Sequence, residues 1–380
     1  MKRRSWIRLL QAGALLFVIG IGGLLAVGSG IVPIKASSGH WAITAWMLEF
    51  AMRRSVATHT LGMDTLKLDE PWLVLKGAGH YETACRPCHG IPGLEHPVVA
   101  RAMTPAPPYL PPDIVSWQPE ELFYIVKHGV KFTGMPAWPT LERDDEVRAM
   151  VAFLLALEKL DAGQYHRLVF GDTASELTVA MRNPELQHAR APFPTCARCH
   201  GADGLGRGNA AFPKLAGQRR EYLLAALEAY ANGARPSGIM QPLAYALTEE
   251  QRSALADYFN NLSGLTNGGP SAENDALPSI PNAESGREIA SRGVPGLGVP
   301  SCRDCHGPGP GRRNPAYPRL AGQYADYIVL QLELFKSGRR GGSPYAHLMR
   351  HVANRLAPEQ MRAVALYYAS LGAGDVDSGR

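Results

Sequence analysis

The chain has 380 residues, among them 40 glycines, 30 prolines and six cysteines, and its formal net charge is +5. This length leaves room for two or three domains behind a leading apolar segment. No Ser-His-Asp arrangement, phosphate-binding loop or other catalytic constellation stands out in the sequence. It therefore gives no support to enzymatic chemistry of those kinds.

The chain opens with an export signal, in which Lys2, Arg3 and Arg4 precede an uncharged stretch from Leu9 to Ile34. A cleaved signal peptide has an apolar core of about 7 to 15 residues, whereas a spanning helix needs about 20. We expect residues 1–35 to form a retained transmembrane helix with a cytoplasmic N-terminus. The small residues of "AVGSG" keep cleavage open as an alternative. No cysteine directly follows the stretch, which excludes a lipoprotein anchor.

Residues 36–70 are predicted to form an amphipathic juxtamembrane helix and a linker. In "SSGHWAITAWMLEFAMRRSVATHT", Ser37 or Ser38 is the expected N-cap. The apolar stripe of the helix contains Trp41, Ala45, Leu48 and Met52. The pattern leaves two positions open, one on the membrane surface and one against the first globular domain.

Three later segments each hold two cysteines, two residues apart, with a histidine directly after the second. They are "TACRPCHG" (83–90), "TCARCHG" (195–201) and "SCRDCHG" (301–307), and they use all six cysteines. CxxCH is the attachment sequence of c-type haem, in which the thiols add to vinyl groups and the histidine ligates the iron. The motifs predict three haem c groups. The attachment residues would be Cys85, Cys88, Cys196, Cys199, Cys302 and Cys305, and the proximal ligands His89, His200 and His306.

Other uses of paired cysteines fit the pattern less well. A zinc site needs four ligands, and a histidine adjoining the second cysteine is poorly placed to join the same metal. A thioredoxin-type motif would follow a strand, but no β-branched run precedes any copy. A disulfide is the ordinary expectation in an exported protein, yet cysteines three positions apart rarely bridge in a helix. A disulfide also leaves the recurring histidine unexplained.

The spacing of the motifs divides the rest of the chain into three units. The second and third are one repeat, because "FPKLAGQRREYLLAALEAYANGAR" (212–235) aligns with "YPRLAGQYADYIVLQLELFKSGRR" (317–340). Apolar residues at a period of 3.6 predict helices between Gly- and Pro-rich loops, hence an all-α fold of three tandem domains. We expect the domains at 71–165, 166–266 and 285–380, with a linker at 267–284 that is rich in Pro, Gly, Ser and Asn.

The sixth iron ligand separates a carrier from a catalyst, because a strong ligand closes the iron and an open position admits oxygen or peroxide. Met240 is the only methionine between the second motif and the end of its unit, and the repeat places it over Met349. In the first unit Met135 lies in the Gly/Pro loop "KFTGMPAWP" just before a helix. We therefore predict Met135, Met240 and Met349 as sixth ligands.

Other methionines and two histidines are alternative candidates for the sixth ligand. Met103 follows His89 too closely to allow a helix between two ligands, and Met150 fits a helical core position. In the third unit Met361 also fits a helical core position. The remaining alternatives in the third unit are His347 and His351.

The last two units resemble a dihaem cytochrome of the c4 type, in which two class I cytochrome c domains are joined in tandem. The motifs that carry the resemblance are "CARCHGADGLGRG" and the pair "FPKLAGQRREYL" and "YPRLAGQYADYI". Through "CRPCHG" and "TGMPAWP" the first unit resembles the monohaem domain of membrane-bound cytochromes that serve periplasmic dehydrogenases or oxidases. Together the likenesses cover residues from about 78 to 372.

The resemblance implies an electron carrier, not an enzyme, with three His/Met-ligated haems. It would be anchored in the inner membrane of a bacterium with its domains in the periplasm, and no role with nucleic acid is expected. It would relay electrons between a quinol-oxidising complex or dehydrogenase and a terminal oxidase or other acceptor. The alternative is a haem enzyme, or the cytochrome subunit of a dehydrogenase or reductase, with one open iron.

The distribution of charge between the first and third units bears on which unit docks on a redox partner. Residues 285–372 contain twelve Lys or Arg against five Asp or Glu, whereas residues 71–165 contain eight against eleven. A basic third unit could steer onto an acidic patch of a redox partner. These arginines could equally bind haem propionates and solvate the surface.

Overall fold

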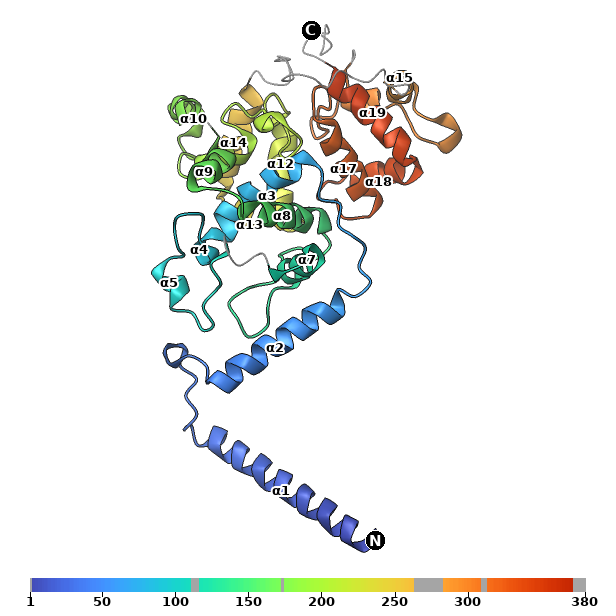
Figure 1. Ribbon diagram of the computed structural model, residues 1–380. Helices are drawn as coiled ribbons and strands as arrows, with labels where there is room; N and C mark the ends of the chain where they lie inside the picture. Colours follow the sequence, from blue (N-terminus) through green and yellow to red (C-terminus); the bar gives the residue numbers. More distant parts are fainter. Residues whose placement is uncertain (1, 111–115, 172–173, 263–282, 309–312, 372–380) are drawn as a thin grey trace.

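The computed structural model describes residues 2–110, 116–171, 174–262, 283–308 and 313–371. Within these residues the chain forms α-helices and short 3-10 turns, and no strand. Two isolated β-bridges join Ile91 to Leu94 and Val294 to Val299. The predicted all-α class is confirmed. Two N-terminal helices lead into a body of three helical groups (Figure 1).

Helix α1 (Lys2–Gly28) extends away from the rest of the molecule (Figure 1). Its segment Trp6–Gly28 has 23 residues and a mean hydropathy of 2.2, and none of its most apolar window is buried in the described structure. This length and composition suit a membrane span, and a signal sequence has the same features.

Helix α2 (Ala42–His59) begins later than predicted, with Trp41 as its N-cap. Ser38 instead closes the short turn η1 (Ala36–Ser38), where its hydroxyl donates to the carbonyl oxygen three residues earlier at 2.9 Å. The prediction that Ser37 or Ser38 caps the helix is wrong. A local bond from the serine side chain to the backbone competes with capping.

The C-terminal half of α2 packs on the first helical group. Val56 is buried, and the guanidinium carbon of Arg53 lies 4.9 Å from the ring centroid of Trp117, a cation–π contact. The N-terminal half leaves large apolar side chains exposed, namely Trp41, Ile43, Trp46 and Phe50. The C-terminal half therefore takes the position against the first helical group, and a membrane-surface position of the N-terminal half stays a prediction.

The first helical group covers residues 71–170. Its helices are α3 (Pro71–Ala84), α4 (Arg86–His89), α5 (Val98–Arg101), α7 (Pro119–His128), α8 (Asp144–Leu157) and α9 (Ala162–Phe170). Helices α3 and α8 cross closely because Gly77 leaves room for the backbone of Ala149, which a Cβ at residue 77 would overlap. At the centre of the group, the rings of Tyr81 and Phe153 lie 5.1 Å apart.

Helix α9 runs across the predicted domain boundary at residue 165. Its Tyr165 and Val169 are buried in the core of the first group, and the Tyr165 hydroxyl donates to the carboxylate of Glu82 on α3 at 2.7 Å. The first group therefore ends at Phe170 and not at 165. The predicted boundary divides this helix, although two buried residues four positions apart mark a helical face.

The second helical group covers residues 174–262. Its elements are α10 (Ala174–Ala180), η3 (Pro184–Leu186), α11 (Phe193–His200), η4 (Gly206–Gly208), α12 (Arg220–Ala231), α13 (Met240–Tyr245) and α14 (Glu249–Asn261). Helix α14 begins with a capping box. The Thr248 hydroxyl accepts from the Gln251 N–H at 3.3 Å, and the Gln251 side chain accepts from the Thr248 N–H at 3.0 Å.

The third helical group covers residues 283–371. Its elements are α15 (Ala283–Arg292), η5 (Pro295–Leu297), α16 (Cys302–His306), α17 (Ala325–Lys336), α18 (Ala346–Arg355) and α19 (Pro358–Ser370). Helices α17, α18 and α19 follow the order of α12, α13 and α14, as the repeat predicts. Most of the predicted linker at 267–284 lies outside the described residues, and α15 begins at Ala283.

Two glutamines at the same repeat position join the second and third groups. Gln218 donates to the Arg319 carbonyl at 2.7 Å and accepts from its N–H at 3.0 Å. Gln323 donates to the Lys214 carbonyl at 3.0 Å and accepts from its N–H at 3.1 Å. Both side chains are buried, so each amide satisfies a backbone donor and acceptor of the other group.

Candidate functional site

Each CxxCH histidine ends a short helix. His89 is the last residue of α4, His200 of α11 and His306 of α16. The residue that follows is a glycine with positive φ in every case: 72° at Gly90, 79° at Gly201 and 73° at Gly307. Glycine adopts this conformation without a steric penalty, so it ends the helix and turns the chain away directly after the imidazole.

The three histidines also share a hydrogen bond to a proline carbonyl. The distance from Nδ1 to the oxygen is 3.0 Å for His89 and Pro108, 3.1 Å for His200 and Pro213, and 2.9 Å for His306 and Pro318. A carbonyl oxygen only accepts, so Nδ1 carries the hydrogen and Nε2 keeps a free lone pair. Such a bond fixes the orientation of a metal-ligating imidazole.

Burial keeps these imidazoles neutral. Desolvation lowers the pKa of His89, His200 and His306 below the usual value, and the bond to the proline carbonyl only partly opposes it. The neutral ring is the form that can ligate iron.

The six cysteines all lie in the described residues, and none forms a disulfide. Burial raises the pKa of Cys85 and Cys196 to about 12 and that of Cys302 to about 11, and it also raises the pKa values of Cys199 and Cys305. No three His, Cys, Asp or Glu side chains in the described chain gather as a metal site. One imidazole beside two thiols would suit a haem, which the thiols would attach and whose porphyrin would supply the other nitrogen ligands of the iron.

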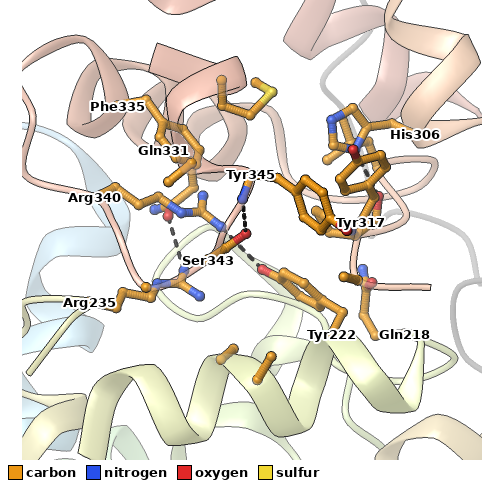
Figure 2. A pocket seen from close by; sticks show the side chains of 18 of the residues that line it. Gln218, Tyr222, Arg235, His306, Tyr317, Gln331, Phe335, Arg340, Ser343 and Tyr345 are labelled. Carbon is orange, nitrogen blue, oxygen red and sulfur yellow. Dashed lines mark hydrogen bonds between the residues drawn. The ribbon is translucent and has the colours of Figure 1, made fainter. Parts of the chain in front are cut away.

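A cavity lies between the second and third groups (Figure 2). Cys305, His306 and Met349 line it together, so the structure brings an attachment cysteine, the proximal ligand and the predicted sixth ligand of the third site to one space. The volume free of protein atoms is about 1310 Å³, and this figure includes the part of the cavity that is open to solvent. The rings of Tyr317 and Tyr345 meet edge to face beside His306, with 5.0 Å between centroids.

The competing ligands of the third site lie elsewhere. Met361 is buried in the core at 2% exposure, as its helical position predicts. His347 and His351 are exposed on α18, where they contact Pro344 and Arg355. In the first group Met150 is likewise a core residue, at 1% exposure.

The charge of the cavity is positive. Its cationic lining residues are Lys214, Arg235, Arg319 and Arg340, and no Asp or Glu is among the lining residues. Arg340 Nη2 donates to the Tyr222 hydroxyl at 3.2 Å, and Arg235 Nη2 donates to Gln331 Oε1 at 3.2 Å (Figure 2). Buried guanidinium groups without a carboxylate favour an anionic ligand. The two propionates of a haem meet this requirement, so the residues present fit the group.

These cations also act on Tyr222. Burial by itself opposes ionisation of the phenol, but Arg235 and Arg340 outweigh it and lower the pKa of Tyr222 to about 8. The direction of this shift follows from the two guanidinium groups that face the phenol without a carboxylate between them.

At the second site, Met240 is the first residue of α13 and is half-buried. Its backbone N–H donates to Ser237 Oγ at 3.0 Å. The preceding Ile239 packs against the core of the first group. The loop that carries Met240 is therefore held by the first group, and the role of Met240 as iron ligand stays a prediction.

At the first site two methionines lie close to one another in space. Met135 is half-buried, and its backbone is fixed by its N–H to Thr133 Oγ1 at 3.1 Å and by the Val130 N–H to its carbonyl at 3.2 Å. The methyl group of Met103 lies so close to Gly134 that a Cβ there would overlap it. Its short spacing from His89 argued against Met103 as the sixth ligand, but the fold brings this residue next to the Met135 loop. The role of Met135 also stays a prediction.

Helix α3 links the first and second sites. A Cβ at Gly79 would lie 2.9 Å from Cys199 Sγ and 3.0 Å from the Phe212 ring, so the helix backbone lies directly against the second motif. Arg198 of that motif also donates to Thr83. The first motif starts at Cys85, one residue after α3 ends. One helix thus contacts an attachment cysteine of the second site and leads into the first site.

Sequence reasoning missed the proline carbonyls and the two buried arginines. Pro213 and Pro318 lie at matching places in "FPKLAGQ" and "YPRLAGQ", and Arg235 and Arg340 end the same aligned segment. The signal available in the sequence was that each pair occupies the same position in the two repeats. What remained hidden was that the two repeats face each other and share one cavity.

The fold and the sites define a c-type cytochrome, and comparison with known proteins agrees. Residues 73–154 match the family described as cytochrome c oxidase, cbb3-type, subunit III, and residues 189–263 match cytochrome c. The thiosulfate dehydrogenase electron acceptor of Thiomonas intermedia (strain K12) is 38% identical over 176 residues, which are 46% of this chain and 78% of the relative.

Two further relatives are cytochromes c4. The protein from Thiocapsa roseopersicina is 34% identical over 178 residues, 46% of this chain and 86% of the relative. A solved cytochrome c4 from Acidithiobacillus ferrooxidans is 36% identical and covers 46% of this chain and 98% of its own, with a TM-score of 0.40. The chain belongs to the cytochrome c family that contains these proteins. It is an electron carrier, and its cofactor is haem c.

Proposed function

We propose that the protein carries three haem c groups, each held by one CxxCH motif, and relays electrons one at a time along the chain. Covalently bound haem supplies the reversible one-electron couple of its iron. The chain's own residues fix the groups and close the iron. In our assignment His89 pairs with Met135, His200 with Met240 and His306 with Met349. A thioether favours ferrous iron more than an imidazole does, so relatively high potentials follow.

The single observation that carries this proposal is the threefold recurrence of one local geometry. Each motif ends its helix at the histidine, turns at a glycine with positive φ, and has Nδ1 bonded to a proline carbonyl. Three imidazoles that present Nε2 in the same way support three haem sites of one kind. The cavity lined by His306 and Met349 supports a closed iron at the third.

The packing of the groups supports a relay. Helix α3 lies against Cys199 of the second motif, and the second and third groups share the cavity beside His306. The helix that leads into the first site thus contacts the second, and the second and third groups meet beside the third. These contacts support a route from the first site through the second to the third.

The redox partners we propose are a dehydrogenase or a quinol-oxidising complex as donor and a terminal oxidase or other acceptor. The likeness to a protein described as a thiosulfate dehydrogenase electron acceptor favours a dehydrogenase of that kind as donor. We further propose that α1 is retained as an anchor in the inner membrane, with the helical groups in the periplasm. Its apolar, unburied segment of 23 residues supports an anchor.

The decisive test is the optical spectrum of the purified, dithionite-reduced protein before and after carbon monoxide, with haem content measured on the same sample. We expect three haems per chain and an unchanged spectrum, because closed irons do not bind carbon monoxide. A haem content of two, or a shift of one third of the haem, would contradict the proposal and point to a small substrate at an open iron.

A further inference from the structure

The loop at residues 236–239, which precedes Met240, is docked on the first helical group along its whole length. Arg143 Nη1 donates to the Pro236 carbonyl at 2.7 Å. Gly238 touches the indole of Trp138 so closely that a Cβ would overlap the ring. Ile239 packs against the buried core of the first group. The first group therefore fixes the backbone from which Met240 extends.

One carboxylate of the first group organises this contact. Glu146 on α8 is buried at 2% exposure. Its Oε1 accepts from Ser237 Oγ at 2.6 Å and lies 3.0 Å from Arg143 Nη2. Its Oε2 accepts from the Gly238 N–H at 2.7 Å and from Trp138 Nε1–H at 3.1 Å. Every oxygen of this buried charge is satisfied, and two of its donors come from the loop of the second group.

Ser237 connects the Glu146 carboxylate to the backbone of Met240. While it donates to Glu146, its Oγ accepts from the Met240 N–H at 3.0 Å and from the Ile239 N–H at 3.3 Å. Two hydrogen bonds in series thus connect the carboxylate to the backbone of the predicted ligand. On its other side the carboxylate holds Trp138, which lies three residues after Met135.

The third group has no serine at the matching place. After the aligned arginines Arg235 and Arg340, the second unit continues with Pro236 and Ser237, whereas the third continues with Gly341 and Gly342. The repeat can therefore carry a predicted methionine ligand without this serine. Its presence in the second unit belongs to the contact with the first group.

We propose that Glu146 and Ser237 are positioning residues for Met240, and that the first group thereby completes the haem site of the second. This rests on the proposed role of Met240 as sixth ligand. A thioether is a neutral ligand, and its bond to iron depends on how firmly its loop holds the sulphur in place. Outer hydrogen bonds of this kind orient a ligand and tune its centre.

The test uses the full-length, haem-loaded protein with Ser237→Ala and Glu146→Ala. S237A is the primary variant because it removes one oxygen and no charge. We expect one haem of three to lose its methionine-to-iron charge-transfer absorption, to bind carbon monoxide when reduced, and to show a lower midpoint potential. The potential of the third haem should stay at its wild-type value. E146A should reproduce the loss of absorption, and the double variant should add little to it.

Asp145→Asn is the matched control. Asp145 is the adjacent carboxylate on α8, it is also largely buried, and its bonds go to Lys76 and Arg143 within the first group. D145N disturbs the same charge cluster but leaves Ser237 and Met240 in contact, so the absorption of all three haems should persist. If D145N removed the absorption as S237A does, a general loosening of the interface would replace the positioning role.

Met240→Leu separates failure of the ligand assignment from failure of the inference. An unchanged spectrum and no carbon monoxide binding in M240L would show that Met240 is not the ligand. If M240L opens one haem while S237A and E146A both keep wild-type absorption and potentials, Met240 stands as ligand and the positioning role is overturned. S237A alone decides the matter where E146A does not fold.

Discussion

Arg340 of the third group donates a hydrogen bond to the hydroxyl of Tyr222 in the second, at 3.2 Å. The residues at the same repeat positions make the reciprocal contact. Arg235 of the second group lies 3.4 Å from the hydroxyl of Tyr327 in the third. Each of the two groups therefore places a buried arginine against a tyrosine of the other group. This exchange makes the cavity beside His306 a shared property of both groups.

Replacing Arg340 by Met should lower the potential of the third haem. Removal of a buried cation stabilises the ferric form, which carries one more positive charge than the ferrous form. A fall on the order of 60 mV, a tenfold change for one electron, is expected from redox titration. Arg355→Met on the exposed end of α18 is the control and should leave all potentials in place. Equal shifts in both variants would show that bulk surface charge is responsible.

Gln218→Ala and Gln323→Ala should each destabilise the contact between the second and third groups. Each substitution leaves a buried N–H and a carbonyl without their partner, which costs about 1 to 3 kcal/mol. Denaturant unfolding and limited proteolysis between the groups measure the effect. Gln187→Ala, at an exposed position, should remain within about 0.5 kcal/mol of the wild type. Stabilities of Q218A and Q323A equal to that of Q187A would contradict the bridging role.

Met135→Leu should open the iron of the first site, while Met103→Leu should leave it closed. Both methionines lie beside Gly134, but only Met135 is in the loop that we assign to the haem face. Carbon monoxide should therefore bind one of three haems in M135L and none in M103L. Met150→Leu controls for loss of a thioether in the core of the first group. The reverse result for M135L and M103L would transfer the ligand role to Met103.

His80 should make the first group less stable as the pH falls. It is buried on α3 with its ring 4.9 Å from that of Trp138, and burial, aided by the charge of Arg198, lowers its pKa to about 4. The unfolded chain binds a proton below about pH 6.5 and the folded chain only below about pH 4, so stability is lost between these values. From pH 7 to pH 5 the loss should be about 2 kcal/mol.

Unfolding of the wild type and of His80→Gln at these two pH values isolates this contribution. H80Q keeps a polar side chain of similar size but cannot titrate. The difference between pH 7 and pH 5 should shrink by about 2 kcal/mol in H80Q. An equal pH dependence in both proteins would show that the pKa of His80 is the same in the folded and unfolded chain.

The parts of the fold that local sequence determines could be predicted. The CxxCH spacing marked the three histidines, and the glycine after each of them is part of the same short motif. The core positions of Met150 and Met361 follow from the apolar spacing within their helices. Each of these features depends on residues that lie within a few positions of one another.

The parts that depend on packing between groups could not be predicted. Ser237 and Glu146 are 91 positions apart in the chain, and the sequence around neither residue indicates their contact. Likewise Met103 reaches the Met135 loop only because the chain folds back between them. The end of the first group was misplaced for the same reason, since Tyr165 is buried by Glu82 and Tyr81 of α3.

The close approach of Gly79 to Cys199 has a consequence for how the protein is made. Attachment of haem to a cysteine requires that the thiol be reachable, and Cys199 stays partly exposed although α3 lies directly against it. A Cβ at residue 79 would press on this sulphur, so we expect Gly79→Ala to hinder haem attachment at the second motif. Loading of the second site thus depends on a glycine in a helix of the first group.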